Sequence, residues 1–268
     1  MSNLKDKRLF LLDMDGTIYL DDDVFDGTMD FLAFVKKIGG RYLFLTNNSS
    51  KSAKAYVEKM TRLGIESTTE DFLTSVDATI LYLQANHPGQ LVYASGTATF
   101  CQQLEEAGIR VTTKLCDGID VLLHGNDQEL TFQKLEDSCI LLNRGVTFIA
   151  TNPDWVCPTW YGYVPDCGSV CWMLEKATGR KPKFIGKPQP EMAKLAMARY
   201  GYKPEEAVMI GDRLYTDIAS GINAGIDACF VLSGEGTMAD VATSDVKPTM
   251  IYDNIRAFLT DLQKAHNE

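Results

Sequence analysis

Short apolar segments of two alternating kinds open the sequence, and this alternation limits the possible folds more than any other feature. Residues 9–12 and 42–45 are unbroken apolar runs, which is typical of strands buried on both faces. Each run is followed by apolar residues at helical spacing, in residues 31–38 and 53–63, and glycine ends both stretches. This order of strand, helix, strand and helix predicts a parallel sheet covered by helices.

The rest of the chain continues the alternation in two further segments. In the last third, the expected strands are residues 207–210, 228–232 and 249–252, and the expected helices are residues 192–200, 218–224 and 255–262. In the middle, the expected strands are residues 91–94, 121–123 and 147–150, and the expected helices are residues 98–107 and 132–142. Both segments therefore predict α/β structure.

Turn-forming residues at 86–89 and 179–182 separate the middle segment from the rest of the chain. The length of 268 residues corresponds to roughly 1.8 domains at ~150 residues each. We therefore expect an α/β chain with a Rossmann-like, parallel-sheet core domain formed by residues 1–79 and 183–268. A smaller α/β domain, residues 80–182, is expected to be inserted into it.

The charge balance makes several classes of partner unfavourable. The chain has 36 acidic and 26 basic residues, a formal net charge of −10. Because such a surface repels phosphate backbones and anionic lipid, we expect no nucleic-acid polymer and no membrane as partner. No apolar run approaches the ~20 residues of a membrane helix, and residues 9–12 are too short for a signal peptide. We therefore expect a cytoplasmic protein.

The seven cysteines are odd in number and include no CxxC pair. Cys167 and Cys171 are four positions apart, so they would share a helix face, and Cys157 is nearby. A zinc site would need a fourth ligand, and the chain has only three histidines. We interpret the cysteines as ordinary reduced thiols, and His124, which follows an expected strand, as structural.

The strongest chemical signal is at the end of the first apolar run. Asp13 and Asp15 follow residues 9–12 directly, and positions i and i+2 of an extended chain point to the same side. Both carboxylates therefore lie beyond the carboxyl end of the strand, where open α/β sheets bind their ligands. Because two such neighbours favour a cation, and oxygen ligands favour Mg²⁺, the pair predicts a magnesium site.

Other expected strands end in side chains that suit the same site. Residues 46–48, Thr-Asn-Asn, offer hydroxyl and amide groups before a helix, where a phosphoryl group is readily bound. Asp212 follows residues 207–210, and Asp217 opens the next expected helix. Lys187 lies between a glycine and a proline and adds a cation. The sequence thus predicts that carboxylates, hydrogen-bond donors and a lysine ammonium group lie at one edge of the sheet.

These segments resemble the four motifs of the haloacid-dehalogenase (HAD) superfamily of aspartate-nucleophile phosphatases. The motifs are residues 13–17, residues 46–47, residues 186–188, and residues 211–213 together with 216–217. More narrowly, the chain is similar to the NagD and para-nitrophenyl-phosphatase branch, in which an α/β cap is inserted between the second and third motifs. Residues 150–154, Ala-Thr-Asn-Pro-Asp, match the cap pattern of that branch. The resemblance implies a HAD core with a smaller inserted α/β cap domain.

The resemblance also implies roles in catalysis. Asp13 would be the nucleophile that forms an aspartyl-phosphate, and Asp15 would be the general acid and base. Mg²⁺ would be bound by the Asp13 carboxylate, the Asp15 backbone carbonyl and Asp212. Asp217 would anchor a metal-bound water or Lys187 from the second shell of the site.

Phosphate binding is implied for a second group of residues. Thr46, Asn47, Asn48 and Lys187 would bind the phosphoryl oxygens as charge redistributes. In residues 233–236, Ser-Gly-Glu-Gly, the chain departs from the pattern of the branch, where a threonine is expected. We expect this loop to lie away from the catalytic edge.

The expected cap contains an aromatic stretch that follows the Asn-Pro-Asp motif. In the branch that the chain resembles, this loop sets specificity, so the resemblance implies that Asp154, Trp155, Trp160 and Tyr161 contact the substrate. Alternatively, the rings pack the cap against the core or against a second subunit, in a homodimer formed through the cap.

The resemblance implies a magnesium-dependent phosphatase. Its substrates would be small phosphate monoesters such as nucleoside monophosphates and sugar or aryl phosphates. The alternatives are a phosphotransferase, or a non-catalytic binding or regulatory protein on the same scaffold.

Overall fold

The computed structural model describes residues 3–159 and 161–267, and the chain divides into two compact units. The first unit comprises residues 1–46, 53–73 and 187–268, and the second comprises residues 47–52 and 74–186. The inserted domain expected from the sequence, residues 80–182, lies wholly within the second unit. The main segment of that unit begins at residue 74 and ends at residue 186, so it is longer at both ends than expected. The unit also includes the short segment 47–52.

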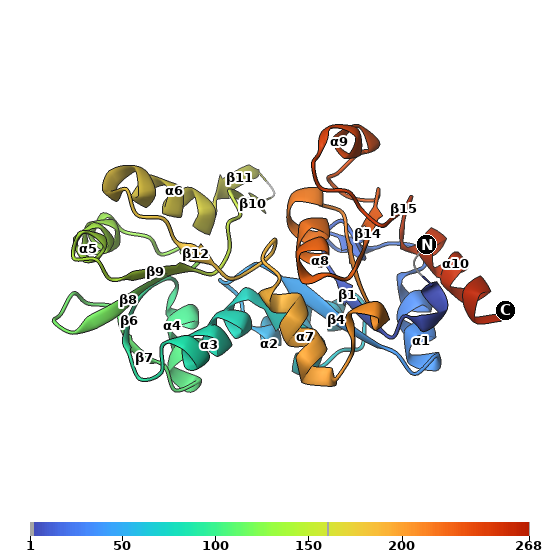
Figure 1. Ribbon diagram of the computed structural model, residues 1–268, viewed down its shortest axis with the longest axis horizontal. Helices are drawn as coiled ribbons and strands as arrows, with labels where there is room; N and C mark the ends of the chain where they lie inside the picture. Colours follow the sequence, from blue (N-terminus) through green and yellow to red (C-terminus); the bar gives the residue numbers. More distant parts are fainter. Residues whose placement is uncertain (1–2, 160, 268) are drawn as a thin grey trace. The chain divides into compact units, whose positions relative to one another are not determined.

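The first unit is built on a six-stranded sheet with the order β15-β14-β13-β1-β4-β5 (Figure 1). The strands are β1 (Leu9–Leu12), β4 (Arg41–Thr46), β5 (Phe72–Thr74), β13 (Ala207–Gly211), β14 (Asp227–Val231) and β15 (Met250–Tyr252). The pairs from β15 to β4 are all parallel. The central strand β1 is wholly buried, which explains its unbroken apolar sequence.

Helices cover both faces of this sheet. They are α1 (Thr28–Lys37), α2 (Ala53–Arg62), α7 (Glu191–Tyr200), α8 (Ala219–Ala224), α9 (Met238–Thr243) and α10 (Ile255–Asn267). Alternate strand residues face opposite layers: Phe10 packs against Phe31 of α1 and Phe258 of α10, and a Cβ at Gly221 of α8 would touch Met209. Figure 1 shows α1 beside α10, and α7 beside α8.

Short elements complete the first unit. They are the 3₁₀ turns η1 (Leu4–Asp6), η2 (Thr69–Asp71) and η3 (Pro204–Glu206), the π-helical turn η4 (Leu214–Ile218), and the hairpin of β2 (Tyr19–Leu20) and β3 (Asp23–Val24). The helix expected at residues 218–224 is therefore preceded by one π turn. The helical segment therefore begins at Leu214, four residues before the expected start, and Asp217 lies within its π turn.

The second unit has a five-stranded parallel sheet with the order β12-β9-β8-β6-β7. The strands are β6 (Leu91–Ser95), β7 (Arg110–Thr112), β8 (Ile119–His124), β9 (Thr147–Ala150) and β12 (Lys183–Phe184). Figure 1 shows α3 (Ser75–Asn86) and α4 (Ala98–Glu106) on one face, and α5 (Phe132–Asn143) and α6 (Cys167–Thr178) on the other. An antiparallel hairpin, β10 (Val156–Thr159) and β11 (Gly162–Pro165), precedes α6.

Local sequence sets the ends of these helices. The Thr74 side chain accepts a hydrogen bond from the Asp77 backbone, and Asp77 in turn accepts from Thr74, so a capping box starts α3. Asp166 caps the first turn of α6, and Gly179 ends this helix in a left-handed conformation (φ 71°).

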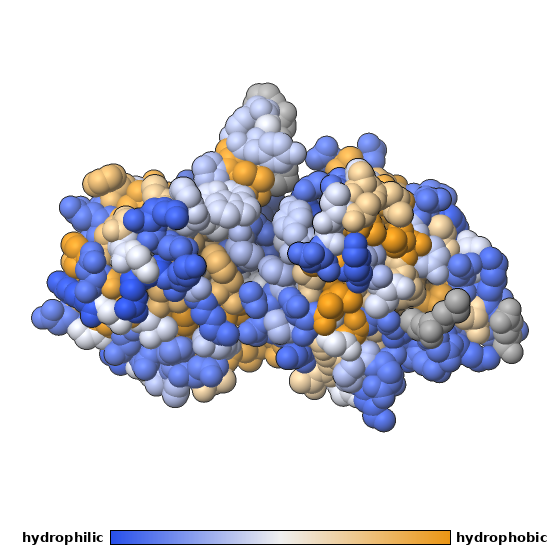
Figure 2. Space-filling model, turned by 45° about the horizontal axis from the view of Figure 1, so that its top comes forward, coloured by the Kyte–Doolittle hydropathy of each residue, from blue (hydrophilic) through white to orange (hydrophobic). Residues whose placement is uncertain are grey.

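The surface agrees with the composition of the chain. Figure 2 shows hydrophilic residues over most of the face that it presents, with apolar residues in small groups among them. Within residues 3–159 and 161–267, every helix is too short or too polar to cross a bilayer.

Candidate active site

The end of β1 places Asp13 at the carboxyl edge of the sheet, between two neighbouring strands. β1 pairs with β13 on one side and β4 on the other, and the Asp13 backbone N–H continues this ladder by donating to Ile210. The chain turns away at Gly16, whose φ of 87° is unfavourable for residues with a Cβ. Asp13 is thus fixed through its backbone while its side chain faces the sheet edge.

Lys187 lies between two carboxylates at this edge. Its Nζ is 2.6 Å from Asp13 Oδ1 and 2.7 Å from Asp217 Oδ1, and it also donates to the Leu45 carbonyl at 3.0 Å. The lysine is 2% exposed. Burial lowers the pKa of Lys187, but the two carboxylates outweigh it and raise that pKa above its ordinary value.

Helix α8 holds the segment that carries this lysine. Ser220 donates to the Gln189 carbonyl at 3.1 Å, and Asn223 donates to the Pro188 carbonyl at 2.9 Å. The two residues after Lys187 are therefore bonded to a helix that packs on the sheet.

Three carboxylates, two of which contact Lys187, lie close together at this edge of the sheet. Asp13, Asp212 and Asp217 offer oxygens that all lie within 4.8 Å of one another. Burial, and next the charge of Asp13, raises the pKa of Asp212 to about 6 and that of Asp217 to about 7. The buried Oδ1 of Asp212 has no hydrogen-bond partner within the described chain. Excess negative charge and an unsatisfied carboxylate oxygen together suit a divalent cation with oxygen ligands.

The loop of residues 233–236 surrounds Asp212, so the expectation that it lies away from the catalytic edge is wrong. The Glu235 backbone N–H donates to Asp212 Oδ2 at 2.7 Å, and the Gly236 N–H donates to the Asp212 carbonyl at 3.1 Å. A Cβ at Gly16 or at Gly234 would overlap the Asp212 side chain. Gly16 and Gly234 are visible in the sequence. That both approach Asp212 becomes clear only from the fold, in which β13 and β14 pair side by side.

Asp217 reaches the site from the π turn η4. Its Oδ2 accepts a hydrogen bond from the Arg213 backbone N–H at 3.1 Å, while its Oδ1 faces Lys187. Single π turns often occur at functional sites, because the extra residue changes the direction of a side chain. Sequence periodicity places Asp217 at a helix start but does not reveal this turn.

The carboxylate of Asp15 contacts two residues that sequence reasoning missed. Lys59 Nζ lies 3.4 Å from Oδ1, and the Tyr19 hydroxyl lies 3.4 Å from Oδ2. Lys59 also lies over the Tyr19 ring, 4.0 Å from its centroid. Loss of hydration raises the pKa of Asp15 above its ordinary value, Lys59 opposes this rise, and the charge of Asp13 adds to it. No local pattern links Lys59 of α2 to the first strand, so only the fold could identify it.

The residues predicted to bind phosphate are divided between the units. Thr46 is buried in the first unit, 3.5 Å from the Tyr56 hydroxyl, next to the Leu45 carbonyl that Lys187 contacts. Asn47 and Asn48 belong to the second unit. There, Asn48 Oδ1 accepts from Ser50.

Asp154 lies in a polar network of the second unit. Asn47 donates to its Oδ1 at 3.3 Å, and Asn152 donates to its Oδ2 at 3.0 Å. Asn152 also donates to the buried Asp166 at 3.3 Å. The second motif and the Asn-Pro-Asp segment therefore meet directly within this unit.

The aromatic stretch near the β10–β11 hairpin is exposed. Trp155 is 56% exposed and lies edge-on to Trp172 of α6, with ring centroids 6.4 Å apart. Tyr161 is 64% exposed. Trp160, the remaining tentative specificity residue, lies outside the described residues.

Comparison with known proteins agrees with this geometry. Residues 10–110 match the family model described as haloacid dehalogenase-like hydrolase, and residues 184–258 match a second, HAD-hydrolase-like model. An acid sugar phosphatase of Staphylococcus aureus is 34% identical over 261 residues, which are 97% of this chain and 100% of that protein. The chain belongs to the haloacid-dehalogenase (HAD) family. The resemblance inferred from the sequence motifs is confirmed.

Solved HAD structures extend the similarity to the fold. A 4-nitrophenylphosphatase from Thermotoga maritima has a TM-score of 0.92 and 36% identity, covering 98% of this HAD chain and 100% of its own. A glycerol phosphate phosphatase from Mycobacterium tuberculosis, in complex with magnesium, has a TM-score of 0.88 and 30% identity, covering 96% and 78% respectively. The Rossmann-like α/β fold class with a smaller α/β cap domain, and the narrower likeness to the para-nitrophenyl-phosphatase branch of HAD phosphatases, are thus confirmed.

Proposed function

We propose that this protein is a magnesium-dependent phosphatase that hydrolyses small phosphate monoesters through an aspartyl-phosphate on Asp13. The observation that carries the proposal is the position of Lys187 Nζ, 2.6 Å from Asp13 and within a cluster of three carboxylates. Because three carboxylates beside one ammonium group would repel an anion, a phosphoryl group suits this site when a metal ion supplies further positive charge.

In the first step, an Asp13 oxygen attacks phosphorus and the bond from phosphorus to the ester oxygen breaks. Asp15 gives its proton to that leaving oxygen, so the product is an alcohol rather than an alkoxide. Lys59 and Tyr19 contact the Asp15 carboxylate and orient it for this transfer. Lys187 holds the Asp13 carboxylate and places a positive charge beside the phosphoryl group that Asp13 receives.

In the second step, water attacks the phosphorus of the aspartyl-phosphate. Asp15, now ionised, takes a proton from that water, and the bond between phosphorus and Asp13 breaks. Inorganic phosphate leaves, and both aspartates return to their starting forms. The division into two displacements lets the same carboxyl group act first as acid and then as base.

The site residues fit Mg²⁺. The carboxylates of Asp13 and Asp212, with the Asp15 backbone carbonyl, would hold the ion, and the unsatisfied Asp212 Oδ1 is the oxygen that most needs it. Asp217 is bonded to Lys187 and Arg213, so we assign it to orienting the lysine. When bound, Mg²⁺ supplies positive charge to the phosphoryl oxygens.

Phosphate binding and specificity extend the proposal. Thr46 and Lys187 of the first unit are assigned to the phosphoryl group, and the roles of Asn47 and Asn48 stay predictions. Sugar and aryl phosphates are favoured as substrates, because relatives at 34% and 36% identity are an acid sugar phosphatase and a 4-nitrophenylphosphatase. For the exposed rings of Trp155 and Tyr161, contact with a ring-bearing substrate and contact with a second copy in a homodimer both stay predictions.

The cellular location is a separate expectation. All seven cysteines are free thiols, which fits a reducing compartment such as the cytoplasm. We propose that location on this ground.

Phosphate release tests the proposal directly. The full-length protein is assayed with 4-nitrophenyl phosphate, sugar phosphates, nucleoside monophosphates and glycerol phosphate, in Mg²⁺ and then in EDTA, with Asp13→Asn as the control. We expect release that requires Mg²⁺ and is absent in the variant. No release from any monoester would favour a non-catalytic binding protein, and alcohol release in excess of phosphate would favour a phosphotransferase.

A further inference from the structure

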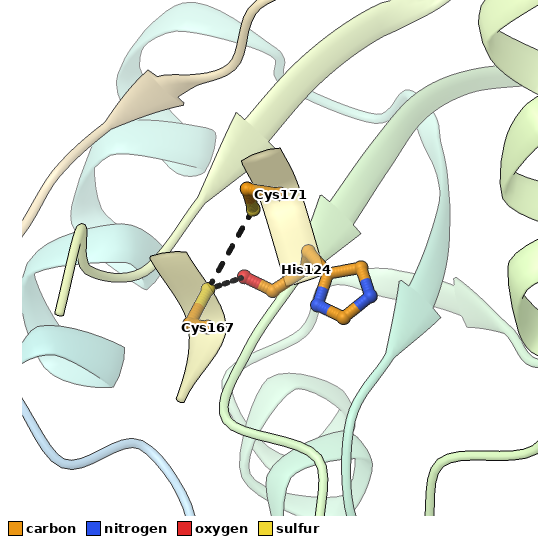
Figure 3. A group of neighbouring side chains, drawn as sticks. All are labelled: His124, Cys167 and Cys171. Atoms are coloured by element: carbon orange, nitrogen blue, oxygen red, sulfur yellow. Dashed lines mark hydrogen bonds between the residues drawn. The ribbon is translucent and has the colours of Figure 1, made fainter. Parts of the chain in front are cut away.

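A cluster of metal-ligating side chains lies inside the second unit, in a part of the chain that the proposed reaction does not use. His124 ends β8, and Cys167 and Cys171 lie on α6; all three are fully buried. One ring nitrogen of the histidine and the two sulfurs lie within 4.8 Å of one another. Figure 3 shows both sulfurs converging on the end of β8.

The local sequence explains this convergence. Asp166 caps α6 so that Cys167 is its first residue, and Cys171 follows one turn later on the same face. That face packs on β8 within a buried apolar cluster that includes Leu122 and Leu174. The histidine, 43 residues before Cys167, is brought to the same point by the strand.

The spacing of the sulfurs fits metal ligation better than a disulfide. Cys167 Sγ and Cys171 Sγ are 3.9 Å apart. Two thiolates bound to one tetrahedral Zn²⁺ at ~2.3 Å are separated by about 3.8 Å. A disulfide needs Cβ atoms about 3.5–4.5 Å apart, whereas residues i and i+4 of a helix hold theirs about 5–6 Å apart.

Polar groups next to His124 and Cys167 are placed to orient these side chains by hydrogen bonds, as is usual around metal ligands. His124 Nδ1 lies 3.0 Å from the Gly125 carbonyl, and Nε2 lies 3.1 Å from Ser95 Oγ. When Nδ1 gives up its proton to bind a metal, the Nε2–H group donates to Ser95, which orients the ring. The Thr151 hydroxyl lies 2.8 Å from Asn152 Oδ1 and 3.8 Å from Cys167 Sγ, so a rotation of its O–H group would give a thiolate a donor.

We propose that the second unit binds a thiophilic metal ion of the Zn²⁺ class through the side chains of His124, Cys167 and Cys171, with the His124 backbone carbonyl, 3.4 Å from Cys167 Sγ, as the fourth ligand. The ion ties the first turn of α6 to the end of β8. Two thiolates and one divalent cation form a neutral group, which a fully buried position tolerates far better than separate charges. The soft sulfur ligands of this site favour a different metal from the carboxylate oxygens of Asp13 and Asp212, which favour Mg²⁺.

Cd²⁺ is the probe for the first experiment, because thiolate ligation gives a charge-transfer absorption that carboxylates do not give. Reduced, chelator-treated full-length protein is titrated in excess Mg²⁺, which occupies the carboxylate site. The titration is run on the native protein and during refolding, since the ligands are buried. We expect a band that saturates at one ion per chain, and no band by either route would overturn the proposal.

Matched variants assign the band. Cys167→Ser and Cys171→Ser should each abolish its saturation at one ion, whereas Cys229→Ser, a buried cysteine of the first unit, should leave it unchanged. Ser95→Ala should lower the affinity about 10- to 100-fold, as loss of a ligand-orienting group does. An unchanged band in both Cys167→Ser and Cys171→Ser would contradict the proposal.

A measurement on the wild-type protein decides the matter if the cysteine variants fail to fold. X-ray absorption of the zinc-loaded protein should show two sulfur ligands, with nitrogen and oxygen completing a four-coordinate shell. A shell of oxygen and nitrogen alone would overturn the assignment. Neither readout depends on phosphatase activity, so the two proposals succeed or fail separately.

Discussion

Lys187 donates its ammonium group to Asp13 at 2.6 Å, across 174 positions of sequence. The same group donates to Asp217 at 2.7 Å, and the lysine is almost fully buried. This contact fixes the carboxylate at the end of β1 to the segment that follows the second unit in the chain. It places a permanent positive charge beside the proposed nucleophile.

Replacement of this lysine should lower both activity and stability. In Lys187→Met, the buried Asp217 and the partly buried Asp13 lose their cation, which costs about 3 to 5 kcal/mol when one partner of a buried pair is removed. The loss of one charge-stabilising donor should lower kcat about 10²- to 10³-fold. Steady-state kinetics and thermal unfolding measure the two effects.

Lys7→Met is the matched control for this variant. Lys7 is also 2% exposed and contacts the Glu205 and Ala207 carbonyls and Asp227, all apart from the carboxylate cluster. It should destabilise the fold but leave kcat of the folded protein within about twofold, because it removes no charge from the reacting centre. Equal loss of kcat in both variants would show that Lys187 acts only through stability.

Replacement of Asp15 should have an effect that depends on the leaving group. Asp15→Asn cannot donate a proton, so kcat/KM should fall about 10²- to 10⁴-fold for an alkyl ester such as glycerol phosphate. The fall should be much smaller for 4-nitrophenyl phosphate, whose phenolate leaves without protonation. Mg²⁺ binding, followed by calorimetry, should be largely kept, since the backbone carbonyl is unchanged. An equal loss for both esters would exclude the general-acid assignment.

Gly234 should be required for metal binding. A Cβ at this position would overlap the Asp212 side chain, which is only 1% exposed and has little room to move. In Gly234→Ala, the Mg²⁺ concentration for half-maximal activity should rise about 10-fold or more, and the overlap should lower the stability of the fold by about 1 to 3 kcal/mol. Glu235→Gln keeps the backbone N–H that donates to Asp212 and should behave as wild type. An unaltered Mg²⁺ dependence in Gly234→Ala would argue against Asp212 as a ligand.

The second unit should lose stability as pH rises through the acid range. Burial raises the pKa of Asp166 to about 7 from an ordinary 3.8. Between these values the folded state holds a proton that the unfolded state has released, so this group favours folding less as pH rises from about 4 to about 7. Asp166→Asn removes this titration and still caps α6, because asparagine is an equally good N-cap.

Thermal unfolding at pH 5 and pH 8, in EDTA, measures this effect. The unfolding temperature of Asp166→Asn minus that of the wild type should become more positive at the higher pH. The exposed Asp117→Asn provides a comparison in the same unit and should show no such trend. A pH-independent difference for Asp166→Asn would mean that Asp166 is ionised in the fold.

The sequence was enough to predict the elements that carry the reaction. Apolar runs such as residues 9–12 and 207–210 have only one arrangement that buries both faces, a parallel sheet, and their carboxyl ends must then meet at one edge. The contact between Lys187 and Asp13 follows from that geometry together with the motif. Prediction is reliable here because local pattern and global fold agree.

Other features depend on contacts that no local pattern records. α3 buries Ser75 and Thr79 as well as Val76, so polar side chains obscure its apolar face. The approach of residues 233–236 to Asp212, and of His124 to α6, depends on strand pairing over long separations. A periodicity argument sees only neighbours within one element and therefore missed them.

The measurement that most directly tests the account is the position of the phosphate on the enzyme during turnover. The wild-type protein is mixed with a radiolabelled monoester in Mg²⁺, quenched in acid, reduced with borohydride and analysed by peptide mass spectrometry. The account predicts label on the chain and homoserine in place of Asp13, with neither in Asp13→Asn. Turnover without a labelled chain, or label on another residue, would contradict it.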